Sequence, residues 1–437
     1  MSKLTYLLIN LPDPSDMFLK ELDTILTKFL WGGKTSKIKK STTYKPYSNG
    51  GLNMYNVYSS LAAFKISWLK RIGNYDQDEC CSLRIYPCLQ NLRKLGNVYP
   101  EHIRKNLQNP FWQDVLKHLN KFMQTPIKLS ADDKKFYLNE PLLFNSNLKT
   151  GKNVITNKEW IENKILTIKD IMNDDLLTFM DFRTFKTKYE HTPNTHFLVF
   201  NSIVYTARQY LTKLKKNTDK CVKCSYWVWE AIKTGNHKVR EYLEKDDKPP
   251  SSTLKSNSYF PNLIWKTIFL KCFKITIDTQ LQWFQARILH RILPTRKYLK
   301  MCKIINSSHC LFCINHQETF SHLFWECHFV QKFWKDLETM LKTKCYNCAR
   351  FSFKMDLVIF GISNGIRTDN AIDFIILFAK FYIYKCRFLD ITPNHTSFIV
   401  QLKHGLSIER LLALKRNNFN QFQILWLPYL NIFENTN

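Results

Sequence analysis

Three cysteines and two histidines lie close together in the stretch CLFCINHQETFSHLFWEC, residues 310–327. Cys310 and Cys313 have two residues between them, His322 follows after eight more, and Cys327 after another four. Two thiolates at the first spacing chelate one ion from a tight turn, and a second pair of ligands closes a tetrahedron. Three thiolates and one imidazole leave no open coordination position. The sequence therefore predicts a structural Zn²⁺ that stabilises the fold and does no chemistry.

The ligand set stays open on the sequence alone, because His309, His316 and His328 stand beside the motif. Glu318 occupies the position at which the short retroviral knuckle has its histidine. The competing interpretation is that cysteines of a cysteine-containing chain cluster here by chance. The regular spacing argues against it, and so do the apolar residues that would pack around a metal: Phe320, Leu323 and Phe324.

Two further C-x2-C pairs, Cys221/Cys224 and Cys345/Cys348, each lack a nearby second pair. We interpret them as plain thiols; the alternative is one four-cysteine site that joins both pairs. The chain has 13 cysteines and no visible signal peptide, so it is expected to be intracellular, with its cysteines as thiols or metal ligands. The expected location is the nucleus, cytoplasmic ribonucleoprotein, or both.

The charge balance points to polyanionic partners. The 437 residues include 64 Lys and Arg against 36 Asp and Glu, a net charge of +28. Such a surplus attracts nucleic acid first and acidic membranes second, although a merely soluble basic protein would have the same composition. With 45% hydrophobic and 23% charged residues, the chain has the composition of a globular protein and not of a disordered one.

Cations and one aromatic residue near the Cys/His knuckle (residues 310–327) form the predicted nucleic-acid surface. Nucleic-acid binding combines cations for the phosphates with flat side chains for unpaired bases. The candidates before and within the knuckle are Arg287, Arg291, Arg296, Lys297, Lys300 and Phe312, and a basic loop near the N-terminus adds Lys37, Lys39 and Lys40. Arg287 and Arg291 are expected one turn apart on one helix, and Phe312 is expected to project from the cysteine turn. The alternative for each run of cations is a solvated surface.

The elements that position these residues are expected to be helices, so the predicted fold class is mainly α. Apolar residues recur at helical spacing over 15–31, where Ser15 or Asp16 caps the start and a Gly pair ends the run. A second helix is expected over 52–72, and a third carries the apolar stripe Leu281, Phe284, Ile288 and Ile292 before Pro294. The run at 374–388 is interrupted by lysine and arginine, so we predict a buried helix and not a membrane span.

The segment FLWGGKTSKIKKSTTYKPYSNGGLNMYNVYSSLAAFKISWLKRI resembles the block after the polymerase core in reverse transcriptases of LINE-type (non-LTR) retrotransposons. NPFWQDVL, EPLLFNSNL and WIENKILTIKDIMNDD resemble the segments that follow in the same order, and FQARILHRILPTRKYLKM with the Cys/His motif resembles the reverse-transcriptase zinc-binding region. The resemblance implies a thumb-like segment (1–75), a helical connector (76–245), a linker (246–258), the zinc-binding domain (259–345) and a C-terminal helical region (346–437).

The resemblance covers the region after the catalytic core, and the catalytic signature of that core is not found. Polymerase chemistry needs carboxylates that hold two metal ions. The Asp doublets at 132–133, 174–175 and 246–247 lack the preceding aromatic residue and flanking strands of such a site. We therefore expect a non-catalytic part that binds RNA, or single-stranded or hybrid DNA, during target-primed reverse transcription. If the chain is part of a larger protein, upstream polymerase domains are its expected partners. The alternatives are a zinc-containing protein-interaction scaffold and an inactive retroelement remnant.

Overall fold

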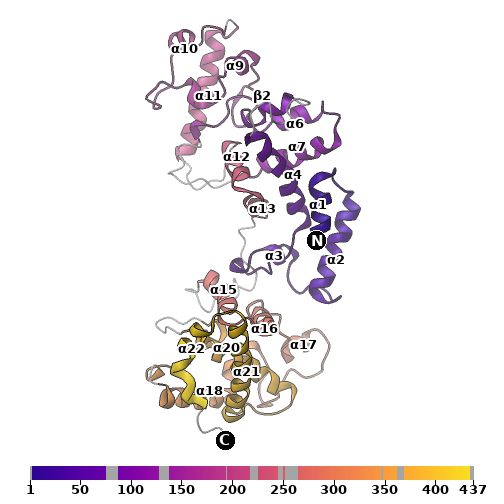
Figure 1. Ribbon diagram of the computed structural model, residues 1–437, viewed down its shortest axis with the longest axis vertical. Helices are drawn as coiled ribbons and strands as arrows, with labels where there is room; N and C mark the ends of the chain where they lie inside the picture. The colour runs from indigo at the N-terminus through magenta and orange to yellow at the C-terminus, as the bar shows by residue number, and fades with distance from the viewer. Residues whose placement is uncertain are drawn as a thin grey trace. The chain divides into compact units, whose positions relative to one another are not determined.

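The computed structural model describes residues 2–74, 87–126, 137–192, 194–216, 225–244, 250, 264–345, 348–361 and 369–433. The described chain is mainly helical, as the sequence predicts, with one short antiparallel hairpin, β1 (Lys149–Thr150) and β2 (Asn153–Val154) (Figure 1). It divides into two compact units. Unit 1 comprises Met1–Lys34 and Tyr55–Asp246, and unit 2 comprises Thr35–Met54 and Asp247–Asn437. The five-part division stays a prediction, and its linker lies, apart from Pro250, outside the described residues.

Unit 1 is a helical assembly around one large apolar core and a second, small one. Its helices are α1 (Ser2–Asn10), α2 (Asp16–Trp31), α4 (Val57–Asn74), η2 (Pro87–Arg93), α6 (Tyr99–Arg104), α7 (Pro110–Met123), α9 (Lys158–Glu162), η3 (Ile168–Ile171), α10 (Phe182–Lys188), α11 (Phe197–Lys216), α12 (Ser225–Thr234) and α13 (Asn236–Leu243). The large core includes Trp112 and Trp160, and Trp68 packs against it.

Helix α2 begins and ends where the sequence predicts. The Ser15 hydroxyl accepts a hydrogen bond from the Phe18 amide, and Gly32 ends the helix in the left-handed conformation at φ 57°. The predicted apolar stripe is only partly buried, however. Leu22 and Leu26 pack against a small core, whereas Ile25 is exposed and Phe29 is 87% exposed.

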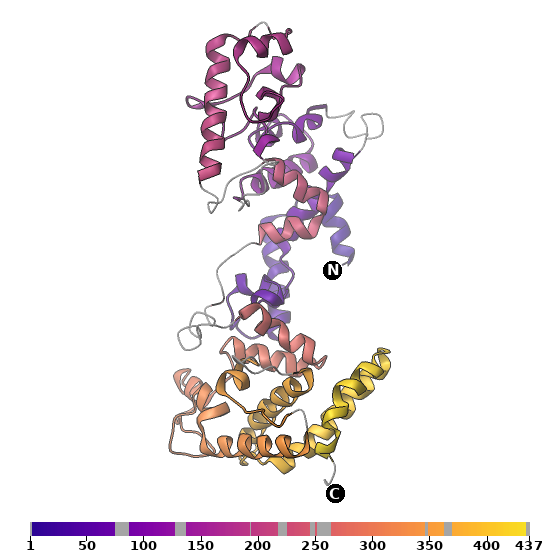
Figure 2. The same ribbon diagram turned by 90° about the vertical axis from the view of Figure 1, so that its left-hand side faces the viewer.

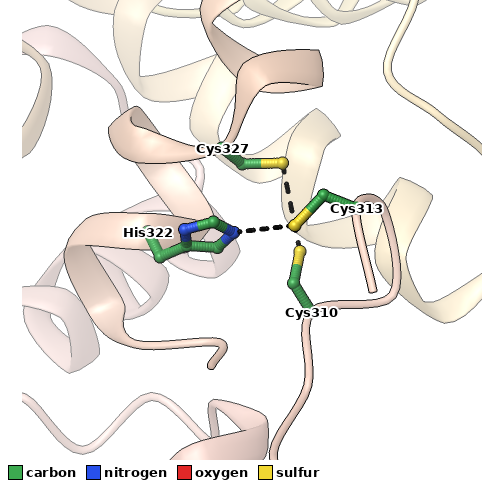
Figure 3. Close-up of side chains that lie close together, drawn as sticks. All are labelled: Cys310, Cys313, His322 and Cys327. Atoms are coloured by element: carbon green, nitrogen blue, oxygen red, sulfur yellow. Dashed lines mark hydrogen bonds between the residues drawn. The ribbon is translucent and has the colours of Figure 1, made fainter. Parts of the chain in front are cut away.

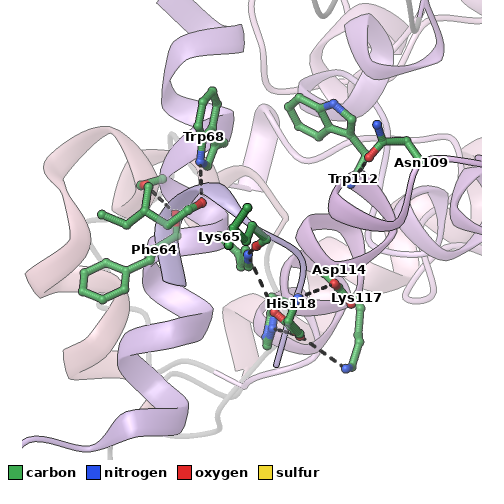
Figure 4. Close-up of polar contacts among 12 residues, drawn as sticks. Phe64, Lys65, Trp68, Asn109, Trp112, Asp114, Lys117 and His118 are labelled. Carbon is green, nitrogen blue, oxygen red and sulfur yellow. Dashed lines mark hydrogen bonds and ion pairs between the residues drawn. The ribbon is translucent and has the colours of Figure 1, made fainter. Parts of the chain in front are cut away.

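A buried polar network joins the start of the chain to α4 and α7 (Figure 4). Asp13 accepts a hydrogen bond from His118 Nε2 at 2.8 Å, and its backbone amide donates to Asp114. The Lys65 ammonium, fully buried, donates to the Leu11 carbonyl and lies 4.0 Å from Asp13. Burial opposes the charge on Asp13, but the bond and charge of His118 outweigh it and lower the pKa of that carboxyl.

Unit 2 is built around helix α20, whose residues are nearly all buried, and its late half is drawn in salmon to yellow in Figure 2. Its helices are α3 (Lys40–Tyr44), η1 (Tyr47–Asn49), α15 (Trp265–Ile275), α16 (Thr279–Leu289), α17 (Arg296–Met301), the π-turn η4 (His322–Glu326), α18 (His328–Lys344), α19 (Met355–Phe360), α20 (Asn370–Phe388), α21 (His395–Lys415), α22 (Phe419–Trp426) and η6 (Leu427–Phe433).

One continuous core runs from Ile268 to Ile432, so the knuckle and the C-terminal helices share it. Helix α20 is buried on nearly all sides, as predicted for 374–388. Its Lys380 ammonium is buried and donates to Gln285 Oε1 at 2.6 Å and to the Ile359 carbonyl. Burial lowers the pKa of Lys380 to about 7. In the part of the chain described, no helix is long and apolar enough to cross a bilayer.

The segment Thr35–Met54 packs on α15 within unit 2. Tyr47 contacts Phe273 with ring centroids 4.2 Å apart, and the Gly50 backbone hydrogen-bonds the half-buried side chain of His290. Gly50 has φ +72°, and a Cβ there would lie 2.6 Å from the Phe269 ring. A Cβ on Gly51 would lie 1.8 Å from the Lys45 carbonyl oxygen. Both positions therefore require glycine.

Candidate metal centre and nucleic-acid surface

The four predicted ligands Cys310, Cys313, His322 and Cys327 converge in unit 2 (Figure 3). Their ligand atoms all lie within 4.8 Å of one another, and all four side chains are buried. Cys310 Sγ is 4.0 Å from Cys327 Sγ, and Cys313 Sγ is 3.3 Å from His322 Nε2. Zn–S bonds of roughly 2.3 Å in a tetrahedron place two sulfurs about 3.8 Å apart. The donor set and its spacing therefore fit zinc.

Two local structures present the ligands. The first pair lies in a turn where the Ile314 amide donates to the Cys310 carbonyl and Ile314 takes φ 58°, and the bridge between His309 and Gln317 closes that turn. The second pair lies at the two ends of the π-turn η4, where the Cys327 amide donates to the His322 carbonyl.

Protons compete with a metal at this centre. A hydrogen bond between the two thiols raises the pKa of Cys310 and lowers that of Cys327. Burial and the neighbouring His316 lower the pKa of His322, which favours the neutral imidazole that a metal needs. Zn²⁺ would replace the shared proton between the two sulfurs.

The neighbouring histidines lie outside this group. His309, His316 and His328 are exposed, and the ring of His316 stacks on His322 with its Nδ1 4.0 Å from Cys313 Sγ. The Cys345 and Cys348 side chains are buried and hydrogen-bonded to each other, and no third ligand joins them in a group within the described ranges. Cys221 and Cys224 lie outside those ranges.

Glu318 ties the knuckle to two other elements. Its side chain is fully buried, and Oε1 accepts from the Arg296 amide at 2.7 Å and from Arg387 Nε at 3.2 Å. Its carbonyl accepts from the Lys297 amide, and its own amide donates to the Ser308 carbonyl. Burial raises the pKa of Glu318, against the opposing effect of Arg387. The start of α17 and the end of α20 are thus fixed to the same loop that holds the zinc ligands.

The predicted cations fall into two groups. Lys297 and Lys300 on α17 are exposed, and so are Lys37, Lys39 and Lys40 in the segment that packs on α15. Arg287 and Arg296 are half-buried.

Arg287 and Arg291 do not share a helix face, contrary to the prediction. Helix α16 ends at Leu289, and Arg291 adopts φ +55° just beyond it. The Arg291 amide donates to the Ile288 carbonyl and the Ile292 amide to the Arg287 carbonyl, which is the Schellman pattern of a helix end. Pro294 disfavours helical backbone at the residue before it, so the chain leaves the helix early.

The prediction that Phe312 projects from the cysteine turn is wrong. Phe312 is only 7% exposed and belongs to the core of unit 2, because the turn packs its apolar side against the surrounding helices. The exposed aromatic near the knuckle is Tyr298, which stands between Lys297 and Lys300 on α17. In the sequence, Tyr298 could have been found as the aromatic residue within the basic run 296–300 that follows Pro294.

The Asp doublets give no polymerase-type geometry where they are described. The Asp175 carboxylate accepts from the amides of Leu177 and Thr178 and organises a turn, and Asp174 lies 3.9 Å from Lys188. The other two doublets lie outside the described residues.

Comparison with known proteins agrees with this geometry. Residues 253–334 match the family described as zinc-binding in reverse transcriptase. The chain is also 29% identical over 157 residues to a Xenopus laevis protein described as "Transposon TX1 uncharacterized 149 kDa protein". That match covers 34% of this chain and 12% of the frog protein. The resemblance to a region of non-LTR retrotransposon reverse transcriptases is confirmed, and with the buried Cys/His cluster it identifies a structural zinc site.

Proposed function

We propose that this reverse-transcriptase zinc-binding region binds RNA or RNA–DNA template during target-primed reverse transcription. Cys310, Cys313, His322 and Cys327 hold a zinc ion that stabilises the fold, and polymerase chemistry belongs to other domains of a larger protein. The observation that supports this proposal is the attachment of α17 to the knuckle. Glu318 receives the Arg296 and Lys297 amides, so zinc binding and the position of the α17 cations are linked.

The exposed side chains of α17 have the chemistry that single strands require. Lys297 and Lys300 offer cations to phosphates, Tyr298 offers a ring on which a base stacks, and Met301 adds exposed apolar surface. Base stacking on an aromatic side chain is worth about 1–3 kcal/mol, and the cations make binding depend on salt. Lys37, Lys39 and Lys40 are further exposed cations of the same unit.

A salt titration of binding to labelled single-stranded RNA tests the proposal. We expect the logarithm of the binding constant to fall linearly with the logarithm of salt concentration. The variant Lys297→Ala/Lys300→Ala should reduce the slope by roughly 1.4, since each contact with a single strand contributes about 0.7. Tyr298→Ala should weaken binding without changing the slope. Lys403→Ala, on the exposed face of α21, is the matched control.

The two alternatives make different predictions. A sample with stoichiometric zinc whose binding to RNA does not depend on salt would favour a protein-interaction scaffold. A sample without zinc and without RNA binding would favour an inactive remnant. Either result contradicts the proposal.

A further inference from the structure

Unit 1 contains an apolar groove that is separate from the zinc centre. Its volume is about 430 Å³, and it lies between α11 and the turn at residues 172–179. Four leucines and two aromatic residues are among the ten residues that line it: Tyr137, Leu138, Leu176, Leu177, Phe179 and Leu211. A cavity of this size and character is typical of a site that receives a ligand or a partner's side chains.

The turn beside the groove holds a leucine in solvent. Met172 and Phe179 pair across its base, and the Asp175 carboxylate accepts from the Leu177 amide at 2.8 Å. Leu176 takes φ 54°, and Leu177 is 83% exposed. A single exposed leucine is ordinary, but this one stands at the edge of an apolar groove.

Arg208 is the one cation among the described residues that line the groove. The Arg208 guanidinium lies over the Phe179 ring, 5.7 Å from its centroid, and is exposed. No ion pair joins Arg208 to a carboxylate in the portion of the chain that the structure describes. On the same face of α11, Tyr205 and Leu198 are three and ten residues before Arg208 and are 62% and 78% exposed. The apolar surface therefore continues along the helix.

We propose that this groove binds a peptide segment of a protein partner, with a bulky apolar side chain in the groove and an adjacent carboxylate on Arg208. The leucine-rich wall suits an aliphatic or aromatic side chain, and the single guanidinium suits one carboxylate. A nucleic-acid strand would require several cations and stacking surfaces, as α17 offers, whereas the described lining of this groove carries one cation. The inference is independent of the proposed role of the zinc-binding region.

Selection from a random displayed-peptide library on the full chain tests this proposal. The wild-type chain should enrich peptides with a bulky apolar residue next to Asp or Glu. Because the whole protein is basic, general attraction of acidic peptides must be separated from recognition by Arg208. Arg208→Glu should therefore enrich Lys or Arg at the same place, whereas Lys158→Glu, an exposed position on α9, should leave the selection unchanged.

One enriched peptide is compared with a charge-reversed peptide, in which Lys replaces its acidic residue. Arg208→Glu should change the ratio of the affinities for these two peptides about tenfold. A tenfold ratio corresponds to about 1.4 kcal/mol. Leu211→Gln should abolish binding of the peptide while circular dichroism stays that of the wild type. No enrichment, or enrichment that ignores residue 208, would overturn the proposal. Displacement of the peptide by single-stranded RNA, dependent on Arg208, would assign the groove to nucleic acid instead.

Discussion

The variant Glu318→Gln tests whether the buried Glu318–Arg387 ion pair stabilises unit 2 independently of zinc binding. The substitution keeps the size of the side chain but leaves Arg387, only 5% exposed, without its carboxylate. Removing one partner of a buried ion pair costs roughly 3–5 kcal/mol. Two contacts favour the lower end of that range. The glutamine carbonyl can still accept from the Arg296 amide, and Arg387 keeps its bond to the Pro294 carbonyl at 2.8 Å. We expect unit 2 to lose about 3 kcal/mol.

Hydrogen exchange measured on peptides from α18 and α20 reports this loss within unit 2. A change of about 3 kcal/mol corresponds to roughly 150-fold faster exchange through global opening. Zinc content should stay at the wild-type value, because none of the four ligands is altered. Affinity for RNA should fall, because the start of α17 loses its charged acceptor. Glu326→Gln, an exposed glutamate in η4, is the control and should change stability by less than about 0.5 kcal/mol.

The double variant Glu318→Gln/Arg387→Met identifies the cause. If the unpaired guanidinium is responsible, removing it should restore part of the stability, with a coupling free energy of about 0.5–3 kcal/mol. Exchange in α20 that rises less than about fivefold in Glu318→Gln would refute the reasoning. A fall in zinc content that accompanies the loss of stability would also refute it, because the Glu318–Arg387 pair would then support metal binding and not the packing.

Three further predictions concern the same unit. Cys313→Ser should remove zinc and unfold unit 2 while exchange in unit 1 stays unchanged, since structural zinc contributes on the order of 10 kcal/mol; equal stability of variant and wild type, with and without chelator, would contradict it. Lys380→Met should abolish a pH dependence of the stability of unit 2. In the folded wild type the pKa of Lys380 is about 7, below the ordinary value of 10.5, so the unfolded chain binds more protons between these two pH values. Wild-type stability therefore rises with pH in that window, by up to about 1.4 kcal/mol per pH unit. Denaturant titrations across that window should show the slope in the wild type and not in the variant. Gly50→Ala should destabilise the packing of Thr35–Met54 on α15 by about 1–3 kcal/mol, because its Cβ would overlap the Phe269 ring, and proteolysis after Lys37 or Lys39 should then be faster; an unchanged cleavage rate would contradict this.

Features set by short stretches of sequence could be predicted. The spacing of the zinc ligands depends on two local turns, the cap at Ser15 depends on its own helix, and the burial of 374–388 follows from composition. The positions of Phe312 and Arg291 could not be predicted in this way. Phe312 points inward because helices far along the chain cover its turn, and Arg291 ends a helix that periodicity alone would continue.

Contacts between residues far apart in the sequence could not be predicted either. Glu318 and Arg387 meet only because α20 crosses behind the knuckle, and a lone glutamate in a metal motif gives no sign of its partner. The same holds for His290 and the Gly50 backbone. Without the structure, the basic loop at 34–40 and the zinc-binding region are two separate segments of the sequence.

The membership of Thr35–Met54 in unit 2 has a consequence for synthesis of the chain. Gly50 and Phe269 pack together but are 219 positions apart in the sequence, so the segment leaves the ribosome long before α15 exists. Unit 1 flanks this segment in the chain on both sides and is completed first, whereas unit 2 can close only after its late half has been translated. Until then the segment's lysines are available to nascent-chain binding factors or to RNA. A fragment that starts at residue 247 would lack the piece that covers Phe269, and supplying residues 35–54 as a separate peptide would be the way to restore it.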